Sequence, residues 1–154
     1  YLDNEFWVLL LPYAWSFEQL EVWLPGGIWT PDAKDYQILA DHELNTGLKG
    51  YPKETEGAYF ASRLAVTEYL VNRKENASAI VFREIGKDYA VPLGVWQIRE
   101  NVRHALNEKP FEFSTIDLAI EFLSKKLKVP FKQYKEKSTL IKHFKTQTRL
   151  SQWF

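Results

Sequence analysis

The last eight residues of the chain carry the side chains whose types and spacing point most directly to a binding function. Gln147, Leu150, Trp153 and Phe154 form the pattern Gln-x-x-Leu-x-x-Trp-Phe at the end of the sequence. One helical turn over residues 147–151 places Leu150 and the two rings on one side and the intervening residues in water. A short apolar triad of this kind suits a small pocket on a partner protein. The alternative is that the rings fold back onto the core of their own chain.

The spacing resembles the PIP box, the peptide by which replication and repair proteins dock on the PCNA sliding clamp. All four motif positions match: Gln147 at the glutamine position, Leu150 at the aliphatic position, and Trp153 and Phe154 at the aromatic pair. The resemblance therefore implies PCNA as a partner and these four residues as its contacts.

A second feature is the separation of charge along the chain. The net charge is zero, but residues 1–123 carry a net charge of −8 and residues 124–154 a net charge of +8. In the basic part, lysines alternate with aromatic residues, which suits phosphate contact combined with base stacking. The candidates for nucleic-acid contact in this part are Lys132, Lys135, Lys142 and Lys145. The alternative is a solvated lysine face on a terminal helix.

Arginines close to apolar stretches form a third candidate group. Trp96, Arg99 and Arg103 share one side of a predicted helix, because offsets of three and four residues are neighbours there. Arg83 ends a predicted strand, and Arg63 on the preceding helix could reach the same region. These residues could recognise phosphate and a base. Alternatively they form buried structural ion pairs with Glu68, Glu84 and Glu100.

Enzymatic chemistry has weaker support in the sequence. Cysteine is absent and the three histidines are scattered, so we predict no metal site, no cofactor and no catalytic residue. Acidic residues in the loop-rich region could still bind Mg or Mn, which leaves a metal-dependent, structure-specific nuclease as an alternative function. These residues are Asp32, Asp35, Asp41 and Glu43.

Hydrophobic patterning predicts the elements that position these residues. We expect a central strand at 5–11, a second strand at 16–24 in a hairpin-like return, a short strand near 36–40, a helix at 55–76, a strand at 79–85, and helices at 92–106, from 114, and around 140–144. The fold class is therefore α/β or α+β, with one mixed sheet, three to four packed helices and a basic C-terminal tail. We divide the chain into a globular domain (1–127), a basic connecting segment or helix (128–146) and the terminal peptide (147–154).

Three segments resemble the C-terminal region of the archaeal Nre DNA repair proteins: residues 56–70, 81–85 and 92–100. The resemblance implies a cytoplasmic archaeal protein that acts in DNA damage repair together with PCNA, and it supplies no defined reaction. The absence of an initial Met predicts that an N-terminal part of the same protein precedes residue 1. A cysteine zinc motif found there in one branch of the family has no counterpart in this sequence. No segment is long enough to cross a membrane. A further alternative is a structural domain that recruits an upstream catalytic half.

Overall fold

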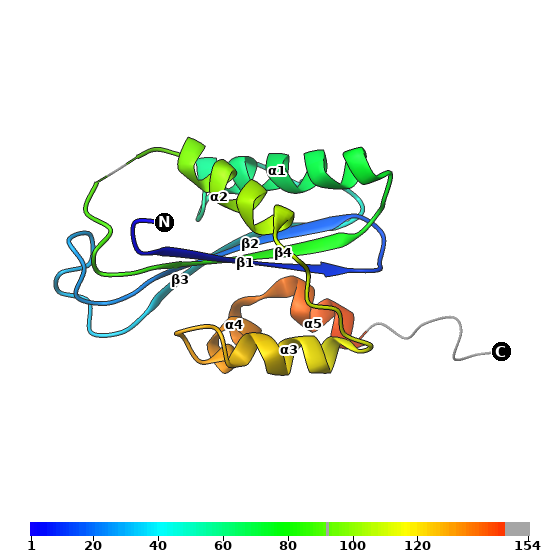
Figure 1. Cartoon of the computed structure of the whole chain (residues 1–154). Helices are drawn as coiled ribbons and strands as arrows, with labels where there is room; N and C mark the ends of the chain where they lie inside the picture. The colour runs from blue at the N-terminus through cyan, green and yellow to red at the C-terminus, as the bar shows by residue number, and fades with distance from the viewer. Residues whose placement is uncertain (92, 147–154) are drawn as a thin grey trace.

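One four-stranded mixed sheet forms the centre of the molecule (Figure 1). The computed structural model describes residues 1–91 and 93–146. The strands are β1 (Asn4–Leu11), β2 (Ser16–Trp23), β3 (Gln37–Glu43) and β4 (Ser78–Ile85), arranged in the order β1-β4-β2-β3. Strand β4 pairs antiparallel with β1 and parallel with β2, and β2 pairs antiparallel with β3.

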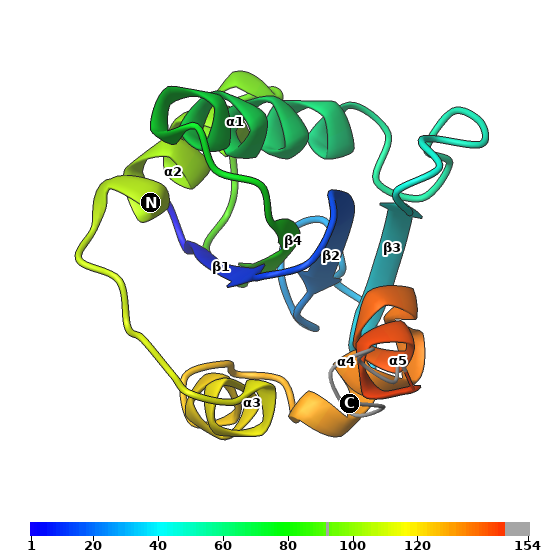
Figure 2. The same ribbon diagram turned by 90° about the vertical axis from the view of Figure 1, so that its right-hand side faces the viewer.

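Helices cover both faces of this sheet. On one face lie α1 (Gly57–Arg73) and α2 (Trp96–Asn107), and on the other lie α3 (Ile116–Ser124), α4 (Phe131–Lys137) and α5 (Thr139–Thr146) (Figures 1 and 2). The linker 108–115 joins the two helical layers and passes outside β1 (Figure 2). This mixed sheet with its helices is an α+β fold, one of the two classes that the sequence predicts, and the described residues form five helices where the sequence predicts three to four. None of the described helices is long and apolar enough to span a membrane.

The two helical layers explain why the central strands are apolar on both faces. Successive side chains of a strand point to opposite faces, so Ala79 and Val81 of β4 pack towards α1 and α2. Ile80 and Phe82, on the other face, pack towards α3, α4 and α5. Each face therefore has its own apolar core, and β4 is buried along its whole length.

The expected position of the first strand is wrong. β1 lies at an edge of the sheet rather than at its centre, and it does not form a hairpin with β2 because β4 lies between them. The connection 12–15 only has to cross one intervening strand, a step of about 10 Å. The apolar run of β1 arises instead because helices lie on both of its faces.

The basic segment 128–146 contributes two helices, α4 and α5, where the sequence predicts one. Tyr134, Leu140 and Ile141 are fully buried and join the core of the face that contains Ile80 and Phe82. The described part of this segment therefore packs onto residues 1–127.

Candidate functional site

Arg83 lies in an enclosed polar cluster on the α1/α2 face of the sheet. Only 4% of the residue is exposed, and its Nη1 donates to Glu21 Oε2 on β2 at 2.7 Å. Nε and Nη2 donate to Asn4 Oδ1 on β1 at 2.9 and 2.7 Å. Side chains from three neighbouring strands thus meet here, and Arg83 has the paired structural role that the sequence left open. Its partner is Glu21 rather than the neighbouring Glu84.

Arg63 on α1 lies over a buried carboxylate at the end of β3. Its Nε donates to Glu43 Oε1 at 2.8 Å, and the indole N–H of Trp15 donates to the same oxygen at 2.6 Å. Glu43 is 2% exposed, whereas the Arg63 side chain is 36% exposed. One side of this guanidinium therefore faces solvent while the other compensates a buried charge.

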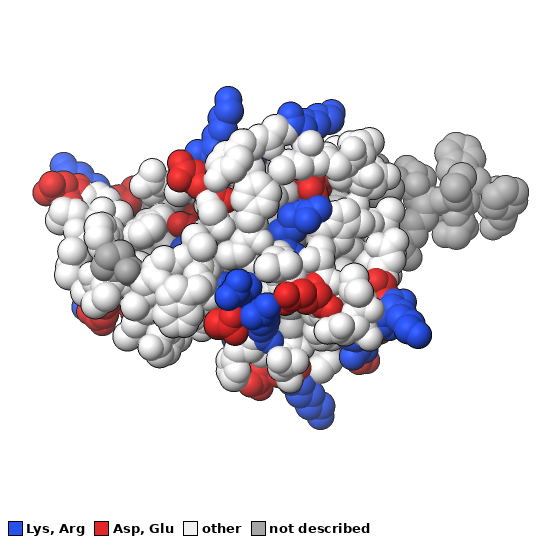
Figure 3. Space-filling view, turned by 90° about the horizontal axis from the view of Figure 1, so that it is seen from above, with Lys and Arg blue, Asp and Glu red and all other residues white. Residues whose placement is uncertain are grey.

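The surface of α2 presents Trp96, Arg99 and Arg103, as the helical spacing predicts. Arg103 donates to both carboxylate oxygens of Glu68 on α1, at 2.9 and 2.8 Å, and to Glu100 at 2.7 Å. The hydrogen bonds to Glu68 raise the pKa of Arg103 above its ordinary value. Arg99 lies 3.2 Å from Glu100, and Trp96 is half exposed. Basic and acidic side chains are interspersed on this face (Figure 3), so it has no single-sign patch.

The α3, α4 and α5 layer carries most of the lysines of the basic segment. Between residues 124 and 146 its only acidic side chain is Glu136. Lys132 is 84% exposed and lies 3.9 Å from Glu136, and Lys135 is also exposed. The other exposed lysines of this layer are Lys125, Lys126, Lys128, Lys137 and Lys142, and the side chain of Lys145 lies outside the described part of the chain.

Two buried glutamates attach this layer to the sheet. Sequence reasoning did not single out Glu18, and it expected Glu84 to pair with an arginine instead. Glu84 on β4 accepts hydrogen bonds from the amides of Lys128 and Val129 and from the Tyr134 hydroxyl, all within 2.9 Å. Glu18 on β2 accepts hydrogen bonds from the amides of Thr139 and Leu140 at the start of α5. The available signal was a glutamate inside a strand that has both faces covered, because a buried carboxylate must find hydrogen-bond donors.

Two of the four acidic residues of the nuclease alternative, Asp41 and Glu43, have structural partners. Asp41 accepts hydrogen bonds from the amides of residues 53–55 and from the Thr55 hydroxyl. Burial disfavours ionisation of Asp41, but these bonds outweigh it and lower its pKa. Glu43 pairs with Arg63, while Asp32 and Asp35 lie in the exposed loop before β3. Within residues 1–91 and 93–146, no group of three or more Asp, Glu, His or Cys is placed to hold a metal ion.

Polar atoms without partners lie beneath α1. Gln19 on β2 is fully buried and follows Phe17 on the same face, and the Phe17 ring meets the ring of Tyr59 on α1 at 5.0 Å. Neither the amide of Gln19 nor the hydroxyls of Tyr59 and Ser62 has a hydrogen-bond partner. Burial raises the pKa of Tyr59, so its phenol stays protonated.

The terminal motif of Gln147, Leu150, Trp153 and Phe154 lies outside the described residues. The helix that directly precedes it, α5, is held on the sheet through Leu140, Ile141 and the Glu18 carboxylate. The motif is therefore joined to a packed element of the body.

Comparisons with known proteins cover almost the whole chain. Residues 43–153 match the family model described as archaeal Nre, C-terminal, and residues 1–30 match archaeal Nre, N-terminal. No solved structure matches.

Three curated relatives are named as DNA repair proteins. NreA of Haloferax volcanii is 41% identical over 147 residues, which is 95% of this chain and 35% of the relative. NreB of Archaeoglobus fulgidus is 38% identical over 145 residues, 94% of this chain and 37% of the relative. NreA of Archaeoglobus fulgidus is 35% identical over 154 residues, 100% of this chain and 37% of the relative. The chain thus spans about a third of the length of these relatives.

Proposed function

Because this chain belongs to the archaeal Nre family, we propose that it acts in DNA repair and docks on the PCNA sliding clamp through residues 147–154. The names of the relatives support the repair role. The observation that carries the docking proposal is the complete motif of Gln147, Leu150, Trp153 and Phe154 at the end of the chain. The family-model match continues to residue 153, so it includes three of these four residues.

The physical basis of docking is the burial of the apolar side chains of Leu150, Trp153 and Phe154 in a pocket of the partner. Each large side chain that is fully buried contributes about 1.5–3 kcal/mol, so Leu150 and the two rings together contribute about 4.5–9 kcal/mol before the cost of association is subtracted. Helix α5 is held on the sheet, which restricts the position from which the terminal motif starts. A motif attached to a fixed helix loses less conformational entropy on binding than one attached to a long free linker.

Titration calorimetry with the cognate clamp tests this proposal. The parent chain should bind in the micromolar range, and Trp153→Ala with Phe154→Ala should abolish measurable heat. The matched control is Thr148→Ala with Gln152→Ala, which alters the same segment at positions between the motif residues and should bind like the parent. Equal binding by the aromatic double variant would show that another surface contacts the clamp.

We further propose that the exposed lysines of the α3, α4 and α5 layer contact the DNA backbone. Lys132 and Lys135 are exposed on α4, and this layer holds the positive half of the charge separation. Arg63, Trp96, Arg99 and Arg103 offer a second, weaker surface, because the carboxylate partners of these arginines lie at 2.7–3.2 Å, whereas Lys132 lies 3.9 Å from Glu136.

A further inference from the structure

The first four residues form a tight turn of the kind that joins two antiparallel strands. The nitrogen of Tyr1 donates to Asn4 O at 2.9 Å, and the amide of Asn4 donates back to Tyr1 O at 3.0 Å. Leu2 and Asp3 between them both have positive φ, 50° and 53°. Two central residues with positive φ and a reciprocal pair of hydrogen bonds are the signature of a two-residue type I′ hairpin turn.

Contacts with the body hold this turn in place. Asp3 O accepts the amide of Gly86 at 2.8 Å, and its carboxylate accepts the amide of Asp88 at 3.0 Å. The Asp88 amide is the main reason that the pKa of Asp3 lies below its ordinary value. A leucine with positive φ has an unfavourable backbone conformation, which persists only where the surrounding structure holds it. The anchored turn is therefore a specific conformation and not a frayed end.

The turn identifies the edge of β1 that lacks a partner. Successive residues of an antiparallel strand direct their N–H and C=O groups to alternate edges. Since Asn4 bonds to Tyr1 on the side away from β4, Phe6, Val8 and Leu10 direct their backbone groups the same way. No strand among the described residues pairs with them, because β4 is the sole neighbour of β1. An open edge of this length is normally covered in a folded protein.

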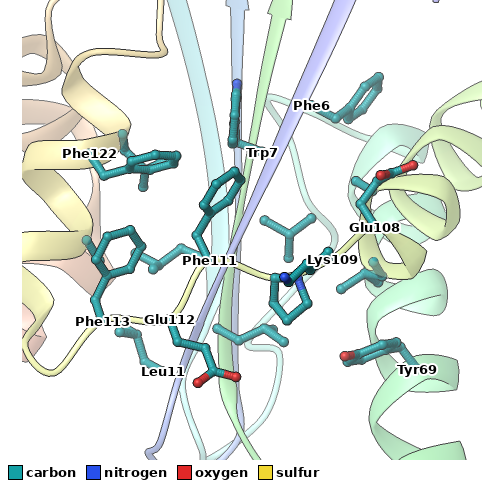
Figure 4. A pocket seen from close by; sticks show the side chains of 18 of the residues that line it. Phe6, Trp7, Leu11, Tyr69, Glu108, Lys109, Phe111, Glu112, Phe113 and Phe122 are labelled. Carbon is teal, nitrogen blue, oxygen red and sulfur yellow. The ribbon is translucent and has the colours of Figure 1, made fainter.

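A groove with room for a strand lies along this edge. It has a volume of about 1040 Å³ and is bounded by β1, α2, α3 and the linker 108–115. Trp7 faces the groove beside Phe111, Phe113 and Phe122 on the α3 side, and Tyr69 of α1 lies on the opposite side (Figure 4). Phe111 is 63% exposed, so this apolar lining is incompletely covered.

We propose that the segment immediately before Tyr1 in the complete protein is a β-strand that pairs antiparallel with β1 in this groove. The family match places residues 1–30 in the N-terminal Nre region, and the relatives are about three times as long as this chain. The hairpin turn fixes the register. The residue before Tyr1 lies opposite Glu5, the second before it opposite Phe6, and the fourth before it opposite Val8. The last two donate backbone N–H groups to β1, so neither is proline.

Hydrogen exchange measured residue by residue in the complete protein and in residues 1–154 tests this proposal. The amides of Phe6, Val8 and Leu10 should exchange at least ~100-fold more slowly in the complete protein, because they gain strand partners. The amides of Trp7 and Leu9 bond to β4 in both chains and serve as the internal reference. Unchanged exchange at Phe6, Val8 and Leu10 would overturn the proposal.

A disulfide test in the complete protein checks the register. Glu5→Cys combined with a cysteine at the residue before Tyr1 places the two Cβ atoms directly opposite, in a non-hydrogen-bonded pair. The control moves the second cysteine one residue further upstream, where its side chain points to the other face of the sheet. Peptide mapping should find the disulfide in the first variant and not in the control. No disulfide in the first variant, or equal formation in both, would contradict the register.

Discussion

The carboxylate of Glu18 on β2 accepts a hydrogen bond from the backbone N–H of Thr139, the first residue of α5, at 2.7 Å. It also accepts the amide of Leu140 at 3.3 Å and the hydroxyl of Ser138. Glu18 is fully buried, and burial raises its pKa to about 7. A titrating group thus connects the sheet to the helix that precedes the terminal motif.

Stability should fall as the pH rises from 5 to 8. The pKa of Glu18 is higher in the folded chain than its ordinary value of 4.5, so the folded state binds the proton more tightly. The stabilisation from this group is complete below pH 4.5 and is lost as the pH rises through 7. The shift corresponds to about 3 kcal/mol of unfolding free energy. Urea unfolding at several pH values in this range gives the unfolding free energy as a function of pH. This free energy should fall less steeply with pH for Glu18→Gln than for the parent.

The control for this pH profile is Glu112→Gln, a change at an exposed glutamate in the linker. Its unfolding free energy should follow the parent profile at every pH. Parallel profiles for Glu18→Gln and the parent would mean that Glu18 has no raised pKa.

Removal of Arg83 should destabilise the chain severely. Arg83→Met leaves Glu21 buried without its cation, and a carboxylate stranded in this way costs about 3–5 kcal/mol. The double variant Arg83→Met with Glu21→Met should recover much of that loss, because no charge then remains buried. Arg73→Met breaks an exposed pair with Glu75 and should change stability little, because solvent screens exposed ion pairs. Urea unfolding that gives similar losses for Arg83→Met and Arg73→Met would contradict this assignment.

The sequence predicts element types better than their arrangement. Apolar runs and helical spacing identify β1, β2, β4 and α1, because these signals are local. Strand order depends on contacts between distant residues, and β4 enters between β1 and β2 although some sixty residues separate it from them along the chain. An apolar run such as β1 indicates cover on both faces, and it does not distinguish an edge from a centre.

The same limit applies to the candidate site. The spacing of Trp96, Arg99 and Arg103 along one helix is a local property and is predictable. Their ion pairs are not predictable in this way, since Arg103 on α2 pairs with Glu68 on the neighbouring helix α1. For Arg63 the partner is Glu43 on β3, twenty residues earlier. Partners of this kind follow from the tertiary arrangement, which single-sequence patterns do not contain.

Residues 43–154, close to the range of the C-terminal family model, should not fold alone. In the sheet, β4 from the C-terminal family region lies between β1 and β2 from the N-terminal family region. A chain that begins at residue 43 loses both neighbours of β4 and the partners of the buried Phe82 and Ile80. Thermal melting followed by circular dichroism should show no cooperative transition for this fragment. A cooperative transition would mean that the helical layers are stable without β1 and β2.

The matched truncation removes residues 147–154 at the C-terminal end. Residues 1–146 retain all the described helices and strands and lack only the terminal motif. We expect this chain to melt like the parent and to lose clamp binding. A large drop in melting temperature would instead indicate that the motif packs on its own core, the alternative that the sequence left open.

DNA affinity should depend on the α3, α4 and α5 layer and on salt. Replacing Lys132, Lys135 and Lys142 by alanine removes three exposed positive charges. Each lost phosphate contact should reduce the slope of log affinity against log salt by about 0.9 for duplex DNA, so the triple variant should bind more weakly with a slope smaller by about 3. Fluorescence anisotropy at several salt concentrations measures both quantities. Arg99→Ala with Arg103→Ala is the comparison on the opposite layer, where carboxylates already compensate the arginines. If that variant loses more affinity than the lysine variant, the DNA surface lies on α2.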